Sequence, residues 1–351
     1  MATISLCMIV RDEETVLGRC LESVKAAVDE IIIVDTGSQD RTKEVAARFT
    51  DRIYDFPWVD DFAAARNFAF SKATMDYQMW LDADDVMPPD SVEKLIRLKA
   101  GLSADLVMLP YHVAFDASGA PTLSYERERL MRRDRGFFWQ GAVHEVITPS
   151  GVILHGDAAV CHRKEHVNDP DRNLRIFEKQ LAEGKAFSPR EQYYYARELL
   201  YHERYVEAIV VFETFLNADG WLEDRISACM QLAKCHLALG ERDAAMTALF
   251  RSFLYDAPRA EICCEIGRLL MEQKRWNEAV FWYKAAIRAP FPDEGFQEGD
   301  CHDYIPYMQL CVCFDRMGNV RQAKTYNDRA GRIKPHDAAY LANKAYFQRC
   351  Q

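Results

Sequence analysis

Short apolar runs and amphipathic segments alternate along the first half of the chain. The runs are rich in strand formers, whereas the segments between them repeat apolar residues every three or four positions, as helices do. We therefore expect strands at residues 3–10, 30–35, 52–56 and 77–82. We expect helices at residues 13–28, 40–49 and 60–73. This alternation predicts right-handed β-α-β crossovers and an α/β fold with a Rossmann-like, mostly parallel sheet.

The pattern changes between residues 105 and 162. Four segments here have strand character and no intervening helix: 105–115, 123–133, 139–149 and 151–162. Strands that follow one another through hairpins are antiparallel, so we expect an antiparallel addition to the sheet.

After about residue 168 the sequence is helical throughout and repeats itself. Four segments align on an alanine, at Ala208, Ala245, Ala279 and Ala323, and twelve positions before each stands another small residue, at Ala196, Ala233, Gly267 and Cys311. The spacing is close to the tetratricopeptide period of about 34 residues, apart from a longer third interval. We predict helical hairpins that pack closely at these small residues. The Pro-, Gly- and acid-rich residues 289–303 in the long interval predict a loop.

The composition is that of a globular protein with two domains. A chain of 351 residues with 49% hydrophobic residues is long enough for two cores, which we place at residues 1–167 and 168–351. Lys and Arg total 44 against 54 Asp and Glu, a net charge of −10, which argues against a nucleic-acid-binding protein.

Cysteine usage and the N-terminal segment predict a cytoplasmic location. The eleven Cys include no C-x-x-C pair, which fits buried thiols in a reducing compartment. The N-terminal segment becomes charged after ten residues without a basic leader, so we expect no signal peptide. No apolar run approaches the roughly 20 residues of a transmembrane helix.

Acidic residues stand at the ends of two predicted strands. Asp35 ends one of them, and Asp82, Asp84 and Asp85 end another. Both ends lie on the same edge of a parallel sheet, which is where ligands bind. Clustered carboxylates repel each other unless a cation lies among them, so they predict a divalent cation with a phosphate on its other side. The plainer alternative is a solvated turn that caps the next helix.

Polar residues also interrupt two apolar segments. Arg66 and Asn67 stand inside an apolar helix, where Arg66 either reaches a phosphate or makes an intramolecular salt bridge, such as one to Asp82. His144 and Glu145 are neighbours on an expected strand, so only one of them can face a given cleft.

Two further histidines, His155 and His162, follow in the same half of the chain. His162 is the stronger candidate, because it ends this half where the chain turns towards the repeats. We take it as a candidate metal ligand.

Four ordered motifs of the first 90 residues resemble those of family 2 glycosyltransferases of the GT-A fold: "ISLCMIVRDEETVLGRCLESV", "DEIIIVDTGSQDRTKEVA", "FAAARNFA" and "WLDADD". The segment "LMRRDRGFFWQGAVHE" resembles the lipopolysaccharide-core and bacteriocin-glycosylating subgroup. Members of this subgroup that modify peptide Cys or Ser also carry tetratricopeptide-like helices. The subgroup usually has Asn where this chain has Asp12, so we assign position 12 no role.

The resemblance implies roles for residues of these motifs. Asp35 would bind the base of a nucleotide, Glu13 would lie near its ribose and Arg66 would line the nucleotide pocket. Asp82 and Asp84 would form the D-x-D motif, with Asp84 bound directly to Mn²⁺ or Mg²⁺ and Asp82 nearer the ribose.

The resemblance also implies the reaction, an inverting transfer from a nucleotide-sugar donor, with a UDP-sugar expected. Glu145 is the expected base and His144 the second choice, while Asp85 is left without a role. We expect a polypeptide acceptor modified on Cys or Ser, with a lipopolysaccharide-core or other glycan as the alternative. A homo-oligomer stays open.

Two other classes of protein are alternatives. A non-catalytic repeat scaffold with a degenerate transferase domain would have lost the acidic residues, and here they are intact. A nucleotidyltransferase would need a Gly-rich, basic loop after the first strand, where this chain has "RDEE".

Overall fold

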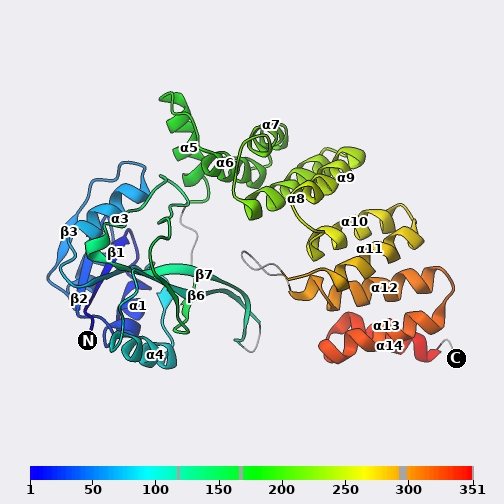
Figure 1. Cartoon of the computed structure of the whole chain (residues 1–351), viewed down its shortest axis with the longest axis horizontal. Helices are drawn as coiled ribbons and strands as arrows, with labels where there is room; N and C mark the ends of the chain where they lie inside the picture. Colours follow the sequence, from blue (N-terminus) through cyan, green and yellow to red (C-terminus); the bar gives the residue numbers. More distant parts are fainter. Residues whose placement is uncertain (117–118, 166–168, 292–298, 350–351) are drawn as a thin grey trace. The chain divides into compact units, whose positions relative to one another are not determined.

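The computed structural model describes residues 1–116, 119–165, 169–291 and 299–349. The chain divides into two compact units, Met1–Ala186 and Phe187–Gln351 (Figure 1). The first is the α/β unit and the second consists of helices, as the two halves of the sequence pattern predict.

The division lies after helix α5 (Arg172–Ala182), not at residue 167 where the sequence pattern changes. Lys179 of α5 forms an ion pair with Asp60 (2.6 Å), and the guanidinium of Arg172 lies 4.6 Å from the ring centre of Phe62. The helix therefore belongs to the first unit, because these side chains attach it to residues 60–62.

The described part of the first unit contains one nine-stranded sheet, with the order β3-β2-β1-β4-β7-β6-β9-β5 and β8 beside β6. The strands are β1 (Ile4–Val10), β2 (Glu30–Asp35), β3 (Ile53–Asp55), β4 (Tyr77–Met79), β5 (Asp85–Val86), β6 (Leu106–Phe115), β7 (Pro121–Arg132), β8 (Ile153–His155) and β9 (Val160–His162). Strands β1 to β4 pair in parallel, whereas β7 is antiparallel to both β4 and β6. The parallel first half and the antiparallel addition through β6 and β7 are confirmed. The segment 151–162 differs from the expected hairpin, because β8 and β9 each pair in parallel with β6.

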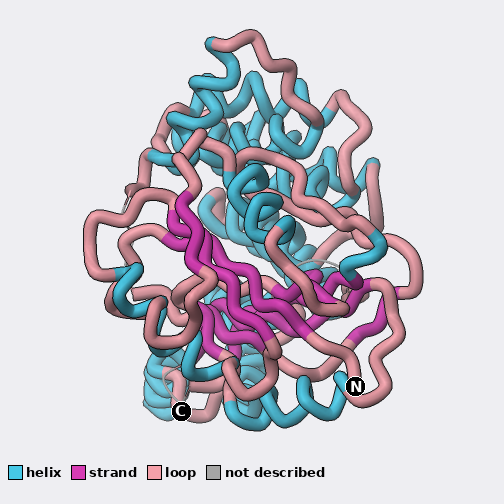
Figure 2. The backbone as a smooth tube through the Cα atoms, turned by 90° about the vertical axis from the view of Figure 1, so that its left-hand side faces the viewer, coloured by secondary structure: helices cyan, strands magenta, loops and turns pink. Residues whose placement is uncertain are grey.

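Helices cover both faces of this sheet, whose strands run side by side in Figure 2. Helices α1 (Leu17–Val24), α2 (Thr42–Ala46) and α4 (Pro89–Lys99) bury apolar side chains in one core with the strands. Helix α3 (Phe62–Ser71) contributes to a second core together with Trp80 and Trp139. A short 3-10 helix, η1 (Arg133–Arg135), follows β7.

The expected strand at residues 139–149 is wrong. This segment is a loop, closed by an isolated bridge between Gln140 and Val146. Its backbone has positive φ at Gly141 (94°) and His144 (52°), which is incompatible with an extended strand. His144 and Glu145 consequently do not alternate across a sheet.

The second unit is built from antiparallel helices that are stacked in pairs (Figure 1). The elements are α6 (Pro189–Tyr201), α7 (Tyr205–Leu216), α8 (Leu222–Ala238), α9 (Arg242–Arg251), η2 (Ser252–Leu254), α10 (Ala260–Glu272), α11 (Trp276–Arg288), η3 (Gly299–Cys301), α12 (Tyr304–Arg316), α13 (Val320–Ile333) and α14 (Ala338–Arg349). Part of the loop expected at residues 289–303, namely 292–298, lies outside the described residues.

Small residues are buried where paired helices meet, as the repeat spacing predicts. Ala196, Ala208, Ala233 and Ala245 have no exposed surface. At Gly267 an added Cβ would lie 2.8 Å from the ring of Tyr283, so this helix pair approaches too closely for a larger residue.

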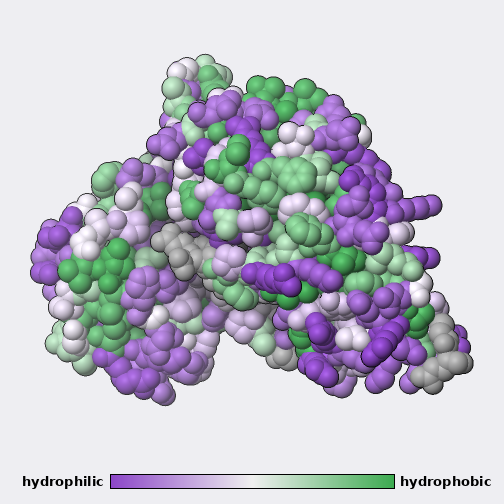
Figure 3. Space-filling view, turned by 45° about the vertical axis from the view of Figure 1, so that its right-hand side comes forward, coloured by the Kyte–Doolittle hydropathy of each residue, from purple (hydrophilic) through white to green (hydrophobic). Residues whose placement is uncertain are grey.

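Apolar residues also reach the surface of this unit, where green and purple groups are interspersed (Figure 3). Among the described residues, no helix has both the length and the apolar character that crossing a membrane requires.

Candidate active site

The acidic strand ends meet at one edge of the sheet. Strand β1 lies between β2 and β4 and is parallel to both, so the three carboxyl ends point the same way. Asp35 is the last residue of β2, and Asp82 comes three positions after β4 ends at Met79. The shared edge predicted from the sequence is confirmed by this topology.

Asp35 is buried, and one of its two oxygens is in use. Oδ1 accepts hydrogen bonds from the backbone N–H groups of Gly37 and Ser38, both at 3.0 Å. Oδ2 is buried and has no hydrogen-bond partner among the described residues. A buried carboxylate oxygen without a donor is costly, and a ligand N–H would satisfy it.

The loop after β1 is tied to the turn after β2. Gln39 donates its backbone N–H to Asp12 Oδ1 (2.7 Å), and Glu13 donates its own to Thr42 Oγ1 (2.7 Å). Asp12 has a φ of 55°, a left-handed conformation that Asn and Asp adopt more readily than other non-Gly residues. Position 12 therefore requires a left-handed backbone and a side-chain acceptor, which Asp supplies as well as Asn.

Glu13 lies in a negative environment. Desolvation, followed by the charges of Asp84, Asp82, Asp40 and Asp12, raises the pKa of Glu13 to about 7. Glu13 therefore lies close enough to both D-x-D acids for their charges to act on it. A bound cation would relieve this repulsion.

Three side chains form a group with the composition of a metal site. Single ligand atoms of Asp84, Asp85 and His162 all lie within 4.8 Å of one another. His162 Nδ1 is 3.3 Å from an oxygen of Asp84 and 3.4 Å from one of Asp85. Carboxylate oxygens with one imidazole suit Mn²⁺ or Mg²⁺, so these donors fit the expected ion. Hydrogen bonds to Asp84 and Asp85 raise the pKa of His162 to about 10.

Asp85, which has no assigned role in the sequence analysis, is fully buried. Its Oδ1 accepts from Tyr111 Oη (2.8 Å), and its Oδ2 accepts from the backbone N–H of Asp82 (3.0 Å) and pairs with Arg129 Nη1 (3.3 Å). Strands β5 and β9 place Asp85 directly opposite His162. Asp85 thus fixes the turn that carries Asp82 and Asp84.

Arg66 joins two of the predicted site residues. Its Nη2 lies 2.7 Å from Asp82 Oδ1, and its Nε lies 2.6 Å from Glu145 Oε1. The guanidinium is buried and lies 4.9 Å from the ring centres of both Trp80 and Trp139. The intramolecular salt bridge considered for Arg66 is therefore present. Asp82 pairs with Arg66 and is not part of the three-residue group described above.

Sequence reasoning missed Arg129, which has no exposed surface and lies 3.8 Å from the ring centre of Trp80. Alternation along β7 does not single it out, because four consecutive residues of this strand, Glu128 to Met131, are buried. His155 lies away from this group and pairs with Glu126.

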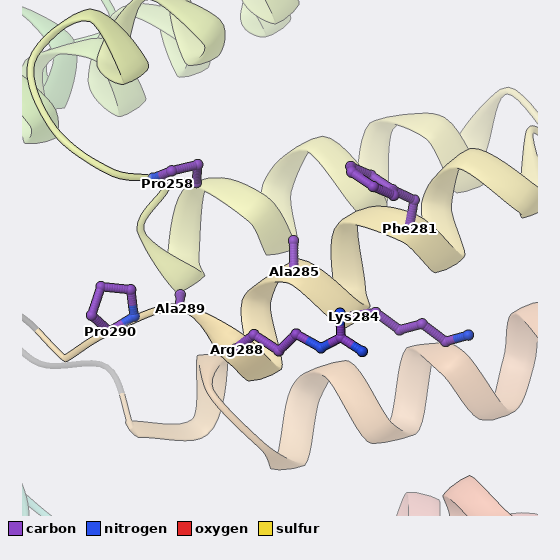
Figure 4. A pocket seen from close by; sticks show the side chains of 7 residues that line it. All are labelled: Pro258, Phe281, Lys284, Ala285, Arg288, Ala289 and Pro290. Carbon is purple, nitrogen blue, oxygen red and sulfur yellow. The ribbon is translucent and has the colours of Figure 1, made fainter.

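The second unit has a separate groove of about 390 Å³ (Figure 4). It is lined by residues of α11, of the segment after it and of the segment before α10: Phe281, Lys284, Ala285, Arg288, Ala289, Pro290 and Pro258. Phe281 is 64% exposed. Within the described part of the chain, neither Lys284 nor Arg288 has a carboxylate partner. No site residue predicted from the sequence lines this groove.

Residues 5–159 match the family model described as "Glycosyl transferase family 2". The first unit is a family 2 glycosyltransferase domain. Residues 260–291 match the model described as "Tetratricopeptide repeat", which covers α10 and α11. The domain has the GT-A architecture, and the chain joins it to tetratricopeptide-like repeats, as the sequence motifs predict.

Three curated relatives are similar to part of this chain. A TPR repeat-containing protein of Synechococcus elongatus is 40% identical over 44% of this chain and 38% of its own length. The SPbeta prophage-derived glycosyltransferase SunS of Bacillus subtilis is 26% identical over 61% of this chain and 53% of its own. The lipopolysaccharide core biosynthesis glycosyltransferase LpsC of Rhizobium meliloti is 30% identical over 43% of this chain and 58% of its own. The chain thus spans less than two thirds of each.

Solved structures are similar at a lower level. Glucosyl-3-phosphoglycerate synthase from Mycobacterium tuberculosis, in complex with Mn²⁺ and uridine-diphosphate-glucose, has 18% identity and a TM-score of 0.35, over 53% of this chain and 81% of that one. The TPR protein YrrB has 19% identity and a TM-score of 0.39, over 51% of this chain and 84% of its own.

Proposed function

We propose that the chain is a metal-dependent, inverting glycosyltransferase that uses a nucleotide-sugar donor, with a UDP-sugar expected. The observation that carries this proposal is the group of Asp84, Asp85 and His162. Asp85 of this group accepts a hydrogen bond from the backbone N–H of Asp82. The side chain of Asp82 pairs with Arg66, which also pairs with Glu145. Metal donors and a candidate base therefore meet in one region of the domain.

The chain's own residues would bind the donor at the edge of the sheet. The free Oδ2 of Asp35 suits an N–H donor on the nucleotide base. Glu13 and Asp82 suit ribose hydroxyls, because carboxylates accept hydrogen bonds from them. Asp84 and His162 would hold Mn²⁺ or Mg²⁺ with Asp85 behind them, and the ion would supply Lewis-acid stabilisation of the diphosphate leaving group.

Glu145 is the proposed base. It would take the proton of the acceptor hydroxyl or thiol while that oxygen or sulfur forms a bond to the anomeric carbon. The bond from this carbon to the diphosphate oxygen breaks, and the electron pair leaves with the nucleoside diphosphate. Attack from the face opposite the leaving group inverts the anomeric centre. His144 is the second candidate, with its backbone in the left-handed conformation next to Glu145.

The proposed acceptor is a polypeptide, modified on Cys or Ser and held by the repeats. The groove on α11 supports this choice, because it combines apolar walls with two cations, Lys284 and Arg288, which have no carboxylate partner among the described residues, in a chain whose net charge is −10. Such a groove suits a segment with an apolar side chain beside a carboxylate. A lipopolysaccharide-core glycan is the alternative, and the similarity to LpsC favours it.

A scaffold with a degenerate transferase domain is the alternative from another class, and the intact acidic residues weigh against it. We place the enzyme in the cytoplasm, since the ten described Cys are free and buried, as thiols are in a reducing compartment.

The test is donor turnover by the purified full chain with a panel of nucleotide sugars and Mn²⁺ or Mg²⁺. Nucleoside diphosphate should be released from one class of donor, should stop in EDTA and should return with added metal. Asp84→Asn should abolish release, whereas Asp51→Asn, at an exposed position, should not alter it. Full turnover in excess EDTA would contradict the metal role.

A further inference from the structure

Asn67 holds the backbone of Trp139 with both ends of its side-chain amide. Its Nδ2 donates to the carbonyl of Trp139 (3.0 Å), and its Oδ1 accepts the N–H of Trp139 (2.8 Å). Two bonds to one residue fix both the position and the orientation of that backbone. The indole of Trp139 is buried beside Phe70 and Trp80, with ring centres 5.9 and 5.1 Å away, so the start of the loop is anchored from both sides.

The rest of the loop is also fastened. The backbone N–H of Phe62, at the start of α3, donates to the carbonyl of Ala142 (2.9 Å). Gln140 and Val146 exchange two backbone hydrogen bonds of 2.9 and 3.0 Å, which close the loop on itself. The first turn and the middle of α3 therefore hold the loop at separate points.

The loop carries Glu145 just before Val146, and the carboxylate of Glu145 is bound by Arg66, the neighbour of Asn67 on α3. His144, just before it, has a φ of 52°, a conformation that costs a non-Gly residue about 1–2 kcal/mol. Residues in such conformations persist where the surroundings over-determine them. The contacts from α3 supply that constraint.

We propose that Asn67 is a positioning residue for Glu145. Asn67 fixes the entry to the loop, and Arg66 fixes its far end, so that α3 sets where the carboxylate lies relative to Asp82. Asn67 belongs to the "ARN" segment and Trp139, 72 positions later, to the "WQGAVHE" segment. Their contact joins the two segments, so that together they position Glu145. This assignment rests on the proposed function, in which Glu145 is the base.

A double-mutant cycle tests the proposal. Asn67→Ala should lower kcat about 30- to 100-fold, because a displacement of about 1 Å can cost a reaction 10²-fold. The donor KM and the Mn²⁺ affinity should change by less than about twofold, since neither depends on Glu145. In a Glu145→Gln background the same substitution should lower kcat by less than about twofold, because the base is already lost.

A general structural role predicts a different result. It would lower kcat by the same factor in both backgrounds, or would raise KM and weaken Mn²⁺ binding, and either outcome would overturn the proposal. Ser71→Ala is the matched control, because Ser71 is an exposed residue of α3 whose hydroxyl donates to the carbonyl of Phe68 on the same helix. If Asn67→Ala does not fold, Asn67→Asp replaces it, since it keeps an acceptor for the Trp139 N–H.

Hydrogen exchange separates this proposal from the proposed function. The amide of Trp139 should exchange about tenfold faster in the Asn67 variant, while amides of β1 keep their rates. If the parent protein turns over no donor, the proposed function fails and the exchange rates still decide whether Asn67 holds the loop. An unchanged rate at Trp139 would overturn the proposal.

Discussion

Asp85 and Arg129 form an ion pair of 3.3 Å in which neither side chain has any exposed surface. The pair lies beneath the turn of the D-x-D acids, where Arg129 also donates to the carbonyl of Trp80 (3.1 Å). It connects the stability of the domain with the geometry of the candidate metal site.

Replacing Arg129 with Met should destabilise the domain by about 3–5 kcal/mol, because it leaves the buried charge of Asp85 without its partner. Urea unfolding of the parent and the variant measures this difference. Arg97→Met is the control, since Arg97 and Glu93 form a largely exposed pair and its loss should change stability by less than about 1 kcal/mol. A loss below about 1 kcal/mol for Arg129→Met would contradict the structural role of the buried pair.

The metal-free protein should lose stability as the pH rises from 6.5 to 10. The pKa of His162 is raised from 6.5 to about 10, so the folded protein keeps a proton that the unfolded chain releases. The stabilising contribution is complete below pH 6.5 and is lost as the pH passes through the folded value. The stability difference between the parent and His162→Asn, measured in EDTA, should therefore shrink between pH 6 and 10.

Binding of Mn²⁺ near pH 7.5 should release about one proton per ion. A metal-ligating imidazole is neutral, whereas the raised pKa of His162, about 10, would keep its imidazole protonated in the metal-free protein at this pH. Calorimetric titrations in buffers with different ionisation enthalpies measure the number of protons. Release of no proton would contradict the expectation that a protonated His162 becomes a ligand of the ion.

Glu145→Gln should lower turnover by roughly 10²-fold or more, with donor binding retained, because it keeps the shape of the side chain and removes its basicity. The binding constant of the donor and kcat are measured separately. Asp157→Asn, at an 83% exposed side chain, is the control and should leave both unchanged. Weaker donor binding with normal turnover would instead make Glu145 a binding residue.

Reversing both charges of the groove, with Lys284→Glu and Arg288→Glu, should reduce transfer to a polypeptide acceptor at least about tenfold through lost electrostatic complementarity. Release of nucleotide from the donor alone should not change. Lys234→Glu with Arg332→Glu makes the same change in net charge at exposed positions outside the groove. Equal losses in both double variants would point to net charge and not to the groove.

Local sequence patterns were enough to predict the framework of this protein. Apolar runs that end at Asp35 and Asp82 predict two strands of a parallel sheet, because burial on both faces requires continuous apolar strands. The first of these strands ends at Asp35 as expected, whereas β4 ends three residues earlier than expected, at Met79. The spacing of small residues such as Ala208 and Ala245 predicts the paired helices, since each repeat has to pack in the same way. These features depend on the periodicity of residues within one segment, and this periodicity can be read directly from the sequence.

Only the tertiary structure decided which side chains meet. Arg66 binds Glu145 across 79 positions, Asn67 binds Trp139 across 72, and Arg129 reaches Asp85 across 44. Local periodicity holds no information about such pairs, because they form only when distant segments pack together. The left-handed backbone of His144 likewise depends on tertiary contacts. The residues around it favour a strand by their pattern, and contacts from α3 hold them in a loop instead.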